Sequence, residues 1–332
     1  MSAFDRDPAL VLADHWQRDF PLLPRPFAKA GKAFDLTEAE TIRALERLAN
    51  RQLLSRIGPV VRPNTAGAST LCALAISKKD LPRIAQAVSA ERYVNHNYER
   101  DHQFNLWFVV AAPTVGERAA CLDRIAAFAG QQPLDLRLLK SFHIDLGFSL
   151  RGGARRELRS SETFRTATPD EIRLIAALED GLPLAPRPYR DVGTRLSTRE
   201  HSVIATLGRL VSDGVVSRFG CVLRHREIGF TANAMACWDV PDDRVEALGR
   251  AVTLEPQVTL CYRRNRSLPE WPYNLFVMVH GRDMATVREV ILGIGGRTGL
   301  LGMPHDVLFS RRCFKQRGAR FLTGRAATEQ AA

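Results

Sequence analysis

The chain of 332 residues contains an internal repeat, which constrains its fold more than any other feature of the sequence. The segment PLLPRPF at 21–27 returns as PLAPRPY at 183–189, an offset of 162 residues. The offset holds without a gap as far as SRIG at 55–58 and SRFG at 217–220. A register kept over this distance indicates two homologous halves, each forming the same supersecondary structure.

Each half is expected to begin with a winged helix-turn-helix. Thr37-Glu38 opens a helical pattern with apolar Ile42, Leu45 and Leu48, and the alternating segment Gln52–Arg62 is typical of a two-stranded wing. The rest of the first half predicts strands at 71–76, 93–99, 104–111 and 134–142 and helices at 80–90 and 114–128. That order, βαββαβ, is the ferredoxin-like unit.

The predicted fold class is therefore α+β, with two tandem copies of a winged helix-turn-helix plus a ferredoxin-like domain. We expect the two halves to pair through their sheets as an intramolecular pseudo-dimer. The predicted boundaries are 10–66 and 67–150 for the first half, 151–168 for a linker, 169–228 and 229–317 for the second half, and 318–332 for a flexible tail.

The composition favours an anionic partner. Lys and Arg number 47 against 36 Asp and Glu, a net charge of +11, and most of the cations are arginines, which bind carboxylates or phosphates with a planar fork. Six scattered cysteines with no CxxC pair argue against a metal site and are typical of a reducing, cytoplasmic protein. No apolar run is long enough to cross a membrane, and no signal peptide is evident.

Several motifs together resemble the siroheme decarboxylase family, whose architecture is similar to that of Lrp/AsnC regulators. His96–Arg100, Asn105–Phe108 and Phe142–Phe148 resemble its first subunit type, and Cys261–Arg264 and Trp271–Gly281 resemble its second. Arg311–Lys315 also resembles the end of the second type. The motifs occur in order across residues 10–318, so the chain resembles a fusion of both types, the form associated with heme d1 synthesis.

The resemblance implies a carbon-carbon lyase that removes CO2 from the C12 and C18 acetates of siroheme, giving 12,18-didecarboxysiroheme. Siroheme carries eight carboxylates, so its site needs several fixed cations, and each decarboxylated carbon needs a proton. Histidine is the usual general acid near neutral pH. The macrocycle takes up the electrons, so no cofactor beyond the iron tetrapyrrole itself is expected.

His96 is the first candidate for the acid, or alternatively for an axial contact to the substrate iron. Strand alternation places it on one face with Tyr98 and Arg100. His102, before the next strand, is expected to join this group. His143 stays open between a catalytic role and packing.

Carboxylates of the substrate are assigned to arginines on matched strands. Arg100, Arg263 and Arg264, together with Tyr262, come first, and Arg56 and Arg218 at the start of each wing come second. Trp107, Trp271 and Phe276 are candidates either for the faces of the macrocycle or for the core, and His280 is assigned to structure.

The two halves are predicted to be chemically unequal. Members of the second subunit type often have His where this chain has Leu260, the position matched to His96. Leucine neither donates a proton nor binds iron. The second half is therefore expected to hold carboxylates, or to complete the site of the first half.

Two other classes of function compete with the enzyme. A DNA-binding regulator is favoured by the basic charge and the two winged helices, whereas Glu38, Glu40, Glu46 and Glu200 on the helices would repel phosphates. A tetrapyrrole chaperone without chemistry is the other. We expect no specific DNA binding and no membrane partner, and a homo-oligomer is left open.

Overall fold

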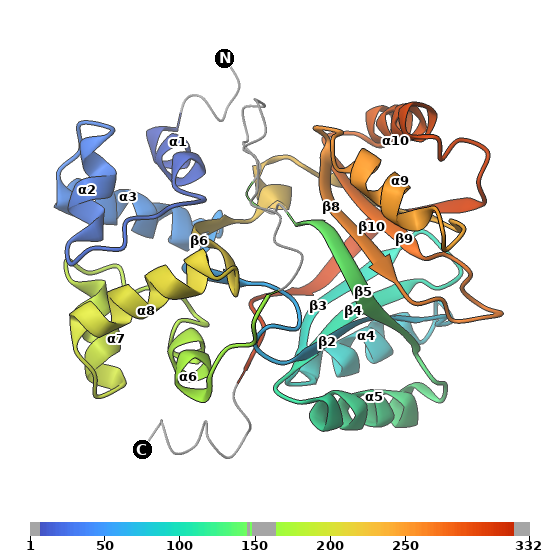
Figure 1. Cartoon of the computed structure of the whole chain (residues 1–332), viewed down its shortest axis with the longest axis horizontal. Helices are drawn as coiled ribbons and strands as arrows, with labels where there is room; N and C mark the ends of the chain where they lie inside the picture. The colour runs from blue at the N-terminus through green and yellow to red at the C-terminus, as the bar shows by residue number, and fades with distance from the viewer. Residues whose placement is uncertain (1–6, 145–146, 148–163, 322–332) are drawn as a thin grey trace.

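Two repeated sets of three helices form one helical unit at one side of the molecule (Figure 1). The computed structural model describes residues 7–144, 147 and 164–321. The helices of the two sets are α1 (Pro8–His15), α2 (Pro26–Lys32), α3 (Glu38–Asn50), α6 (Pro169–Ala177), α7 (Pro188–Arg195) and α8 (Glu200–Ser212). The predicted repeat of helices is confirmed, since α7 and α8 begin 162 residues after α2 and α3.

The helices of both halves share a single apolar core. Thr37 caps α3, because its hydroxyl accepts from Glu40 N and Glu40 accepts in turn from Thr37 N at 2.9 Å. The helical spacing of the apolar residues then buries Leu45 and Leu48 of α3 beside Leu207 of α8. The two helix-turn-helix segments are thus parts of one folded unit rather than independent modules.

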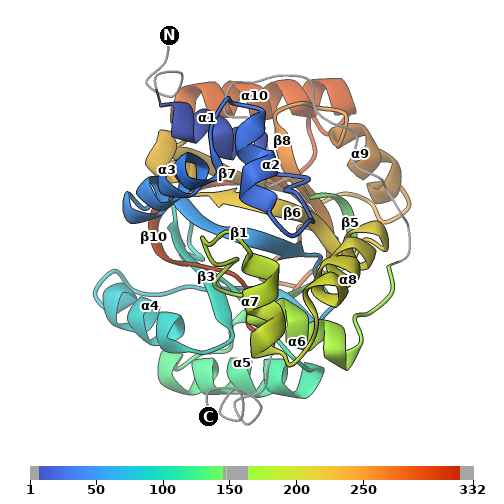
Figure 2. The ribbon, with the colours of Figure 1, turned by 90° about the vertical axis from the view of Figure 1, so that its left-hand side faces the viewer.

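The predicted wings are wrong in one respect. Each half supplies one strand, β1 (Leu54–Val61) or β6 (Val216–Leu223), and these two strands pair with each other in antiparallel fashion. Figure 2, which looks onto the helical unit, shows the two strands side by side. The alternation at Gln52–Arg62 correctly indicated extended chain, but the partner strand comes from the other half. We call this two-stranded sheet the ribbon.

The ferredoxin-like units follow the predicted order of elements closely. The first contains β2 (Ala68–Leu74), α4 (Leu81–Ala90), β3 (Val94–Arg100), β4 (Leu106–Ala112), α5 (Val115–Ala129) and β5 (Leu134–Ile144). The second, after the short 3-10 helix η1 (His225–Ile228), contains β7 (Ala232–Trp238), α9 (Val245–Val252), β8 (Val258–Arg264), β9 (Leu275–Gly281), α10 (Met284–Thr298) and β10 (His305–Gln316). This part of the sequence prediction is confirmed.

The eight strands close into a barrel in the order β10-β3-β4-β2-β5-β8-β9-β7. Within each half the order is that of a ferredoxin-like sheet, and the halves join where β5 pairs with β8 and β10 with β3. The last strand of each half thus pairs with the second strand of the other half. The predicted pseudo-dimer through the sheets is confirmed, and its closure leaves the barrel without an exposed strand edge.

Alternation along the strands separates the outer face of the barrel from its interior. Outward side chains such as Phe108 pack under α4 and α5, while α9 and α10 cover the opposite side (Figure 1). Trp107 of β4 and Phe276 of β9 point inward and, together with Trp271 from the loop before β9, fill one part of the interior. The rest of the interior, beneath the ribbon, contains the cavity described below.

Parts of the predicted linker and of the predicted tail are folded. Residues 164–168 of the expected linker are packed, since Ala167 N donates to Thr65 O and Arg165 pairs with Glu171. The expected tail does not begin at 318, because Phe321 N donates to Glu179 Oε1 at 2.9 Å and the Phe321 ring packs on the helical core. Residues 151–163 and 322–332 lie outside the described residues.

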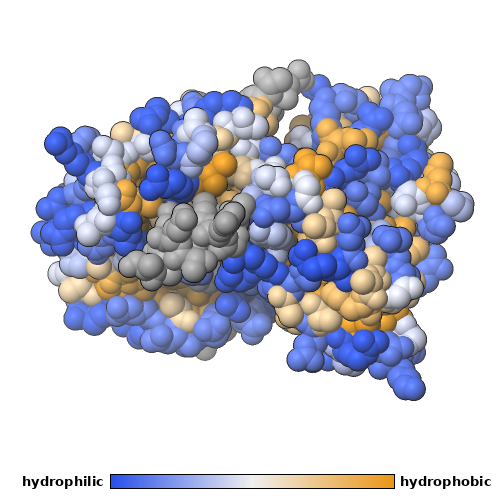
Figure 3. All heavy atoms as spheres, turned by 90° about the horizontal axis from the view of Figure 1, so that it is seen from below, coloured by the Kyte–Doolittle hydropathy of each residue, from blue (hydrophilic) through white to orange (hydrophobic). Residues whose placement is uncertain are grey.

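None of the helices in the described part of the chain has the length and apolarity needed to cross a membrane. On the face shown in Figure 3, hydrophilic residues predominate over both the helical unit and the barrel.

Candidate active site

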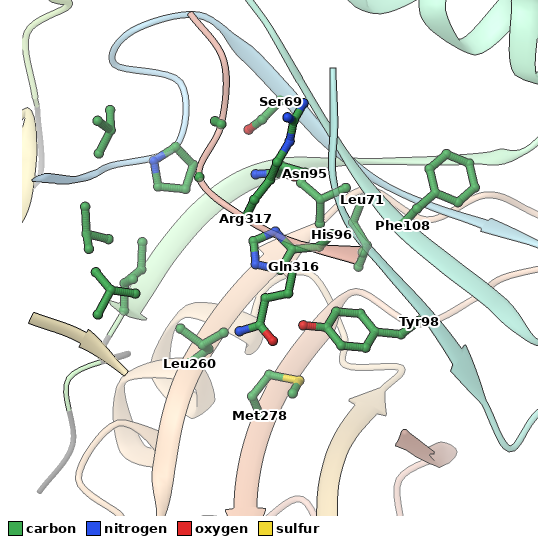
Figure 4. Close-up of a pocket in the computed structure, with 18 of the residues that line it drawn as sticks. Ser69, Leu71, Asn95, His96, Tyr98, Phe108, Leu260, Met278, Gln316 and Arg317 are labelled. Atoms are coloured by element: carbon green, nitrogen blue, oxygen red, sulfur yellow. The ribbon is translucent and has the colours of Figure 1, made fainter. Parts of the chain in front are cut away.

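A cavity of about 390 Å³ lies between the ribbon and the interior of the barrel. Both halves contribute to it: β1 to β5 from the first, and β6 to β10 from the second. Figure 4 shows His96, Tyr98, Gln316 and Met278 around one common space. The cavity therefore lies at the interface between the two halves.

Strand β3 presents His96, Tyr98 and Arg100 to the cavity, as alternation predicts. The rings of His96 and Tyr98 are stacked, with centroids 6.2 Å apart. The intervening Asn97 points the other way, and its Nδ2 donates to Ala85 O at 2.9 Å. The predicted row of imidazole, phenol and guanidinium is confirmed as a feature of the cavity wall.

Strand β8 presents Leu260, Tyr262 and Arg264 in the same way. Arg263 lies on the opposite face, where its Nη2 donates to Asp242 Oδ1 at 2.9 Å. Its predicted role in the site is therefore wrong. The error is one of strand phase, because Arg263 and Arg264 are consecutive and only one of them points inward.

Arg100 and Arg264 make matching contacts in the two halves. Nη1 of Arg100 donates to Leu308 O at 2.9 Å, and Nη1 of Arg264 donates to Leu136 O at 2.8 Å. Each guanidinium also lies over a tyrosine ring of its own strand, at 5.9 and 5.2 Å from the centroid. Nε of both has no hydrogen-bond partner among the described residues. A buried cation on a cavity wall, with a donor left over, suits an anionic partner.

The ribbon places two further cations, Arg56 and Arg218, on the cavity wall. In the β1–β6 register Arg56 lies opposite Val222 and Arg218 opposite Val60. Four residues of strand thus separate the two arginines along the ribbon, roughly 13 Å at the usual rise per residue. We call the two sides of the cavity the Arg56 end and the Arg218 end.

Two further histidines also line the cavity: His225, for which the sequence carries no signal, and His280, which was assigned to structure from the sequence. His225 begins η1, directly after the ribbon, and no motif marks it. His280 is the penultimate residue of β9, on the inward face shared with Phe276 and Met278, and its Nδ1 lies 2.9 Å from Thr259 Oγ1. The alternation of β9 could have placed His280 on the inward face, and the assignment of His280 to structure did not take it into account.

His102 does not reach the cavity, so its predicted place in the constellation is wrong. Its Nδ1 accepts from Phe104 N at 3.0 Å, and its Nε2 lies 3.3 Å from Asp306 Oδ2. β3 ends at Arg100, and the alternation that orients His96 does not continue through the turn. His143, on β5, is buried and is absent from the described cavity lining.

The three imidazoles of the cavity are held in their neutral form. Burial lowers the pKa of His96 to about 4, that of His225 to about 3 and that of His280 to about 4. Neighbouring positive charge adds to the effect, from Arg56 on His96 and from Arg100 on His280. Added anionic charge would reverse this second contribution.

These pKa values predict how stability depends on pH. In the unfolded chain the imidazoles of His96 and His280 become protonated near pH 6.5, whereas in the folded chain they become protonated only near pH 4. The protein should therefore lose stability as the pH falls through this window, by several degrees in melting temperature. Thermal unfolding of His280→Gln beside the parent chain checks this: the variant should show a flatter profile, and parallel profiles would contradict it.

Comparison with known proteins places the chain in a family. The model of an AsnC-like ligand binding domain matches residues 66–144 and 227–315, and the model of a siroheme decarboxylase NirDL-like HTH domain matches 12–54 and 171–216. The siroheme decarboxylase NirDL subunit of Paracoccus pantotrophus is 42% identical over 312 residues, covering 93% of this chain and 96% of the relative. The chain belongs to the siroheme decarboxylase family.

Other siroheme decarboxylases are similar to this chain over nearly its whole length. That of Hydrogenobacter thermophilus is 31% identical over 307 residues, or 90% of each chain. A crystal structure of the siroheme decarboxylase NirDL in co-complex with an iron-uroporphyrin III analogue has a TM-score of 0.67 and 27% identity, covering 98% of both chains. The resemblance predicted from the motifs is confirmed.

In this siroheme decarboxylase the second half also brings imidazoles to the cavity wall, although Leu260 stands at the position matched to His96. Leu260 pairs in register with Met278, so His280 lies one strand away and two residues further along. The repeat places Ala111 at the position matched to His280. The halves are unequal in position, but each brings imidazole to the shared cavity.

Proposed function

We propose that this chain removes CO2 from the C12 and C18 acetates of siroheme in the cavity beneath the ribbon, giving 12,18-didecarboxysiroheme for heme d1 synthesis. The observation that carries the proposal is the meeting of six arginines and three imidazoles from both halves in one cavity. This donor set suits a substrate with eight carboxylates that must also receive protons.

The arginines hold the substrate in one orientation. Arg100 and Arg264 offer an unused Nε each from the barrel, and Arg56 and Arg218 approach from the ribbon. Cations on two opposite walls fix a flat, many-armed anion more firmly than a patch on one surface. Tyr98 and Tyr262 stand beside the arginines, and burial raises the pKa of both phenols, so they remain hydrogen-bond donors.

The imidazoles supply the protons. When the bond between the acetate carbon and its carboxylate breaks, CO2 leaves and the electron pair spreads into the macrocycle. A proton then forms the new C–H bond, so each step is redox-neutral. The carboxylates of bound siroheme favour the charged imidazolium, so His96 becomes an acid as the substrate enters. His225 and His280 take the same role at the Arg218 end.

This chemistry needs a proton and no oxidant, so we propose no cofactor beyond siroheme. The proposal assigns His96 to proton donation. The alternative, an axial contact from His96 to the iron, would appear as a change in the absorption spectrum of bound iron uroporphyrin when His96 is replaced.

The function is tested by anaerobic incubation with siroheme followed by mass spectrometry. We expect a product lighter by two CO2, formed through a species lighter by one. Binding of siroheme without loss of mass would instead favour a chaperone.

The helical unit is proposed to be structural, so the pure protein should show no sequence-specific binding to duplex DNA. Arg25 is engaged by Glu38, and Arg187 by Glu200, at matched positions of the two halves. The shared core also fixes α3 and α8 relative to each other. A nuclease footprint on genomic fragments checks this at physiological salt. Protection of a defined site would contradict it, whereas weak binding that salt abolishes is the background of a basic protein.

A further inference from the structure

Glu179 is the one acidic residue among the described residues that line the cavity. It follows α6, and its Oε1 accepts from Phe321 N at 2.9 Å. Its negative charge acts on Arg56 and on Arg317. Arg317 is in turn tied to the neighbour of His96, since its N donates to Asn95 O at 2.9 Å. Glu179 thus stands at the Arg56 end, in the same corner as His96.

A carboxylate is an unusual component of a site built for a polyanion. Burial raises the pKa of Glu179, while the Phe321 N–H and the cations Arg320 and Arg317 favour its ionised form. Its position is also specific to one half, because the repeat of 162 residues places Gln17 at the matching position. The two ends of the cavity therefore differ, because the repeat does not supply a second carboxylate to match Glu179.

The effect of Glu179 on a bound acetate follows from charge. At the Arg56 end a substrate carboxylate must share its cations with Glu179 and is stabilised less. In the transition state for CO2 loss the negative charge leaves the carboxylate and spreads into the macrocycle, away from Glu179. An interaction that is unfavourable in the ground state and weaker in the transition state accelerates the step.

We propose that Glu179 makes the Arg56 end of the cavity react first and so fixes the order in which the two acetates lose CO2. The inference rests on the proposed decarboxylation of siroheme in this cavity. The bond broken, the CO2 released and the proton taken from imidazolium are the same at both ends, and only their order depends on Glu179.

The order is read from the monodecarboxylated intermediate. The parent chain in excess over siroheme is quenched during a single anaerobic turnover, and the C12 and C18 regioisomers are separated by chromatography and assigned by NMR. We expect one regioisomer from the parent chain. Glu179→Gln, which keeps an acceptor for Phe321 N, should form both isomers and slow the first step about tenfold, which corresponds to about 1.4 kcal/mol of lost repulsion.

Asp180→Asn is the matched control. Asp180 acts on Arg56 more strongly than Glu179 does, but it is exposed and is not part of the described cavity lining, so its loss should leave one regioisomer. Glu179→Asp keeps the charge and should keep the order. A structural role for Glu179 would lower stability without changing which isomer forms.

The outcomes separate the two proposals. A mixture of regioisomers from the parent chain, or a single unchanged isomer from Glu179→Gln at the parent rate, would overturn the role of Glu179. Failure of the parent chain to release any CO2 would overturn the proposed function itself.

Discussion

Replacing His96 with alanine is expected to slow decarboxylation by 10²- to 10⁴-fold, the usual contribution of a general acid. His96 stands on β3 in the cavity wall, close enough to Arg56 for that charge to help lower its pKa to about 4. Alanine leaves the strand intact and removes the proton donor. Single-turnover rates with siroheme measure the effect, with circular dichroism and iron uroporphyrin binding as checks on fold and site.

His102→Ala is the matched control for His96→Ala. From the sequence alone, a milder loss or arrest after one decarboxylation is the prediction for this variant. Its imidazole instead contacts Asp306 and the Trp271 ring outside the cavity, so we now expect both CO2 groups to leave at nearly the parent rate. Full activity of His96→Ala would remove His96 from the chemistry.

The repeat explains why so much of the fold could be predicted. A supersecondary unit found in one half is expected in the other, and local alternation then places each strand, as it did for His96, Tyr98 and Arg100. The pairing of β1 with β6 could not be predicted in this way. It is a contact between residues far apart in the chain, and the alternation of a strand does not say which strand lies beside it.

The same distinction applies to the cavity. Residues carried by repeated strand motifs, such as Arg100 and Arg264, were found because both copies point to them. His225 lies in η1 and Glu179 follows α6, segments whose relation to the barrel depends on how the ribbon docks. The predictions for His102 and Arg263 were wrong for a different reason. A turn, or a shift of one residue along a strand, changes the face on which a side chain lies.

Replacing Arg264 with glutamine is expected to weaken the binding of iron uroporphyrin by about 10- to 150-fold. This corresponds to about 1.5–3 kcal/mol for one charge-assisted hydrogen bond to a carboxylate. Glutamine retains a donor for Leu136 O, the backbone contact of Arg264, so the main loss is the charge facing the cavity. A titration followed by absorbance gives the affinity directly, and single-turnover rates at saturation show whether the chemical step is affected.

Arg263→Gln provides the comparison, because Arg263 is adjacent in sequence and points away from the cavity. Its partner is Asp242 in a partly exposed ion pair, whose loss costs little. Binding should therefore stay at the parent level in Arg263→Gln and fall in Arg264→Gln. Equal losses in the two variants would mean that the overall charge of the protein, and not the inward face of β8, attracts the tetrapyrrole. Normal binding with lost turnover in Arg264→Gln would assign this arginine to the chemical step.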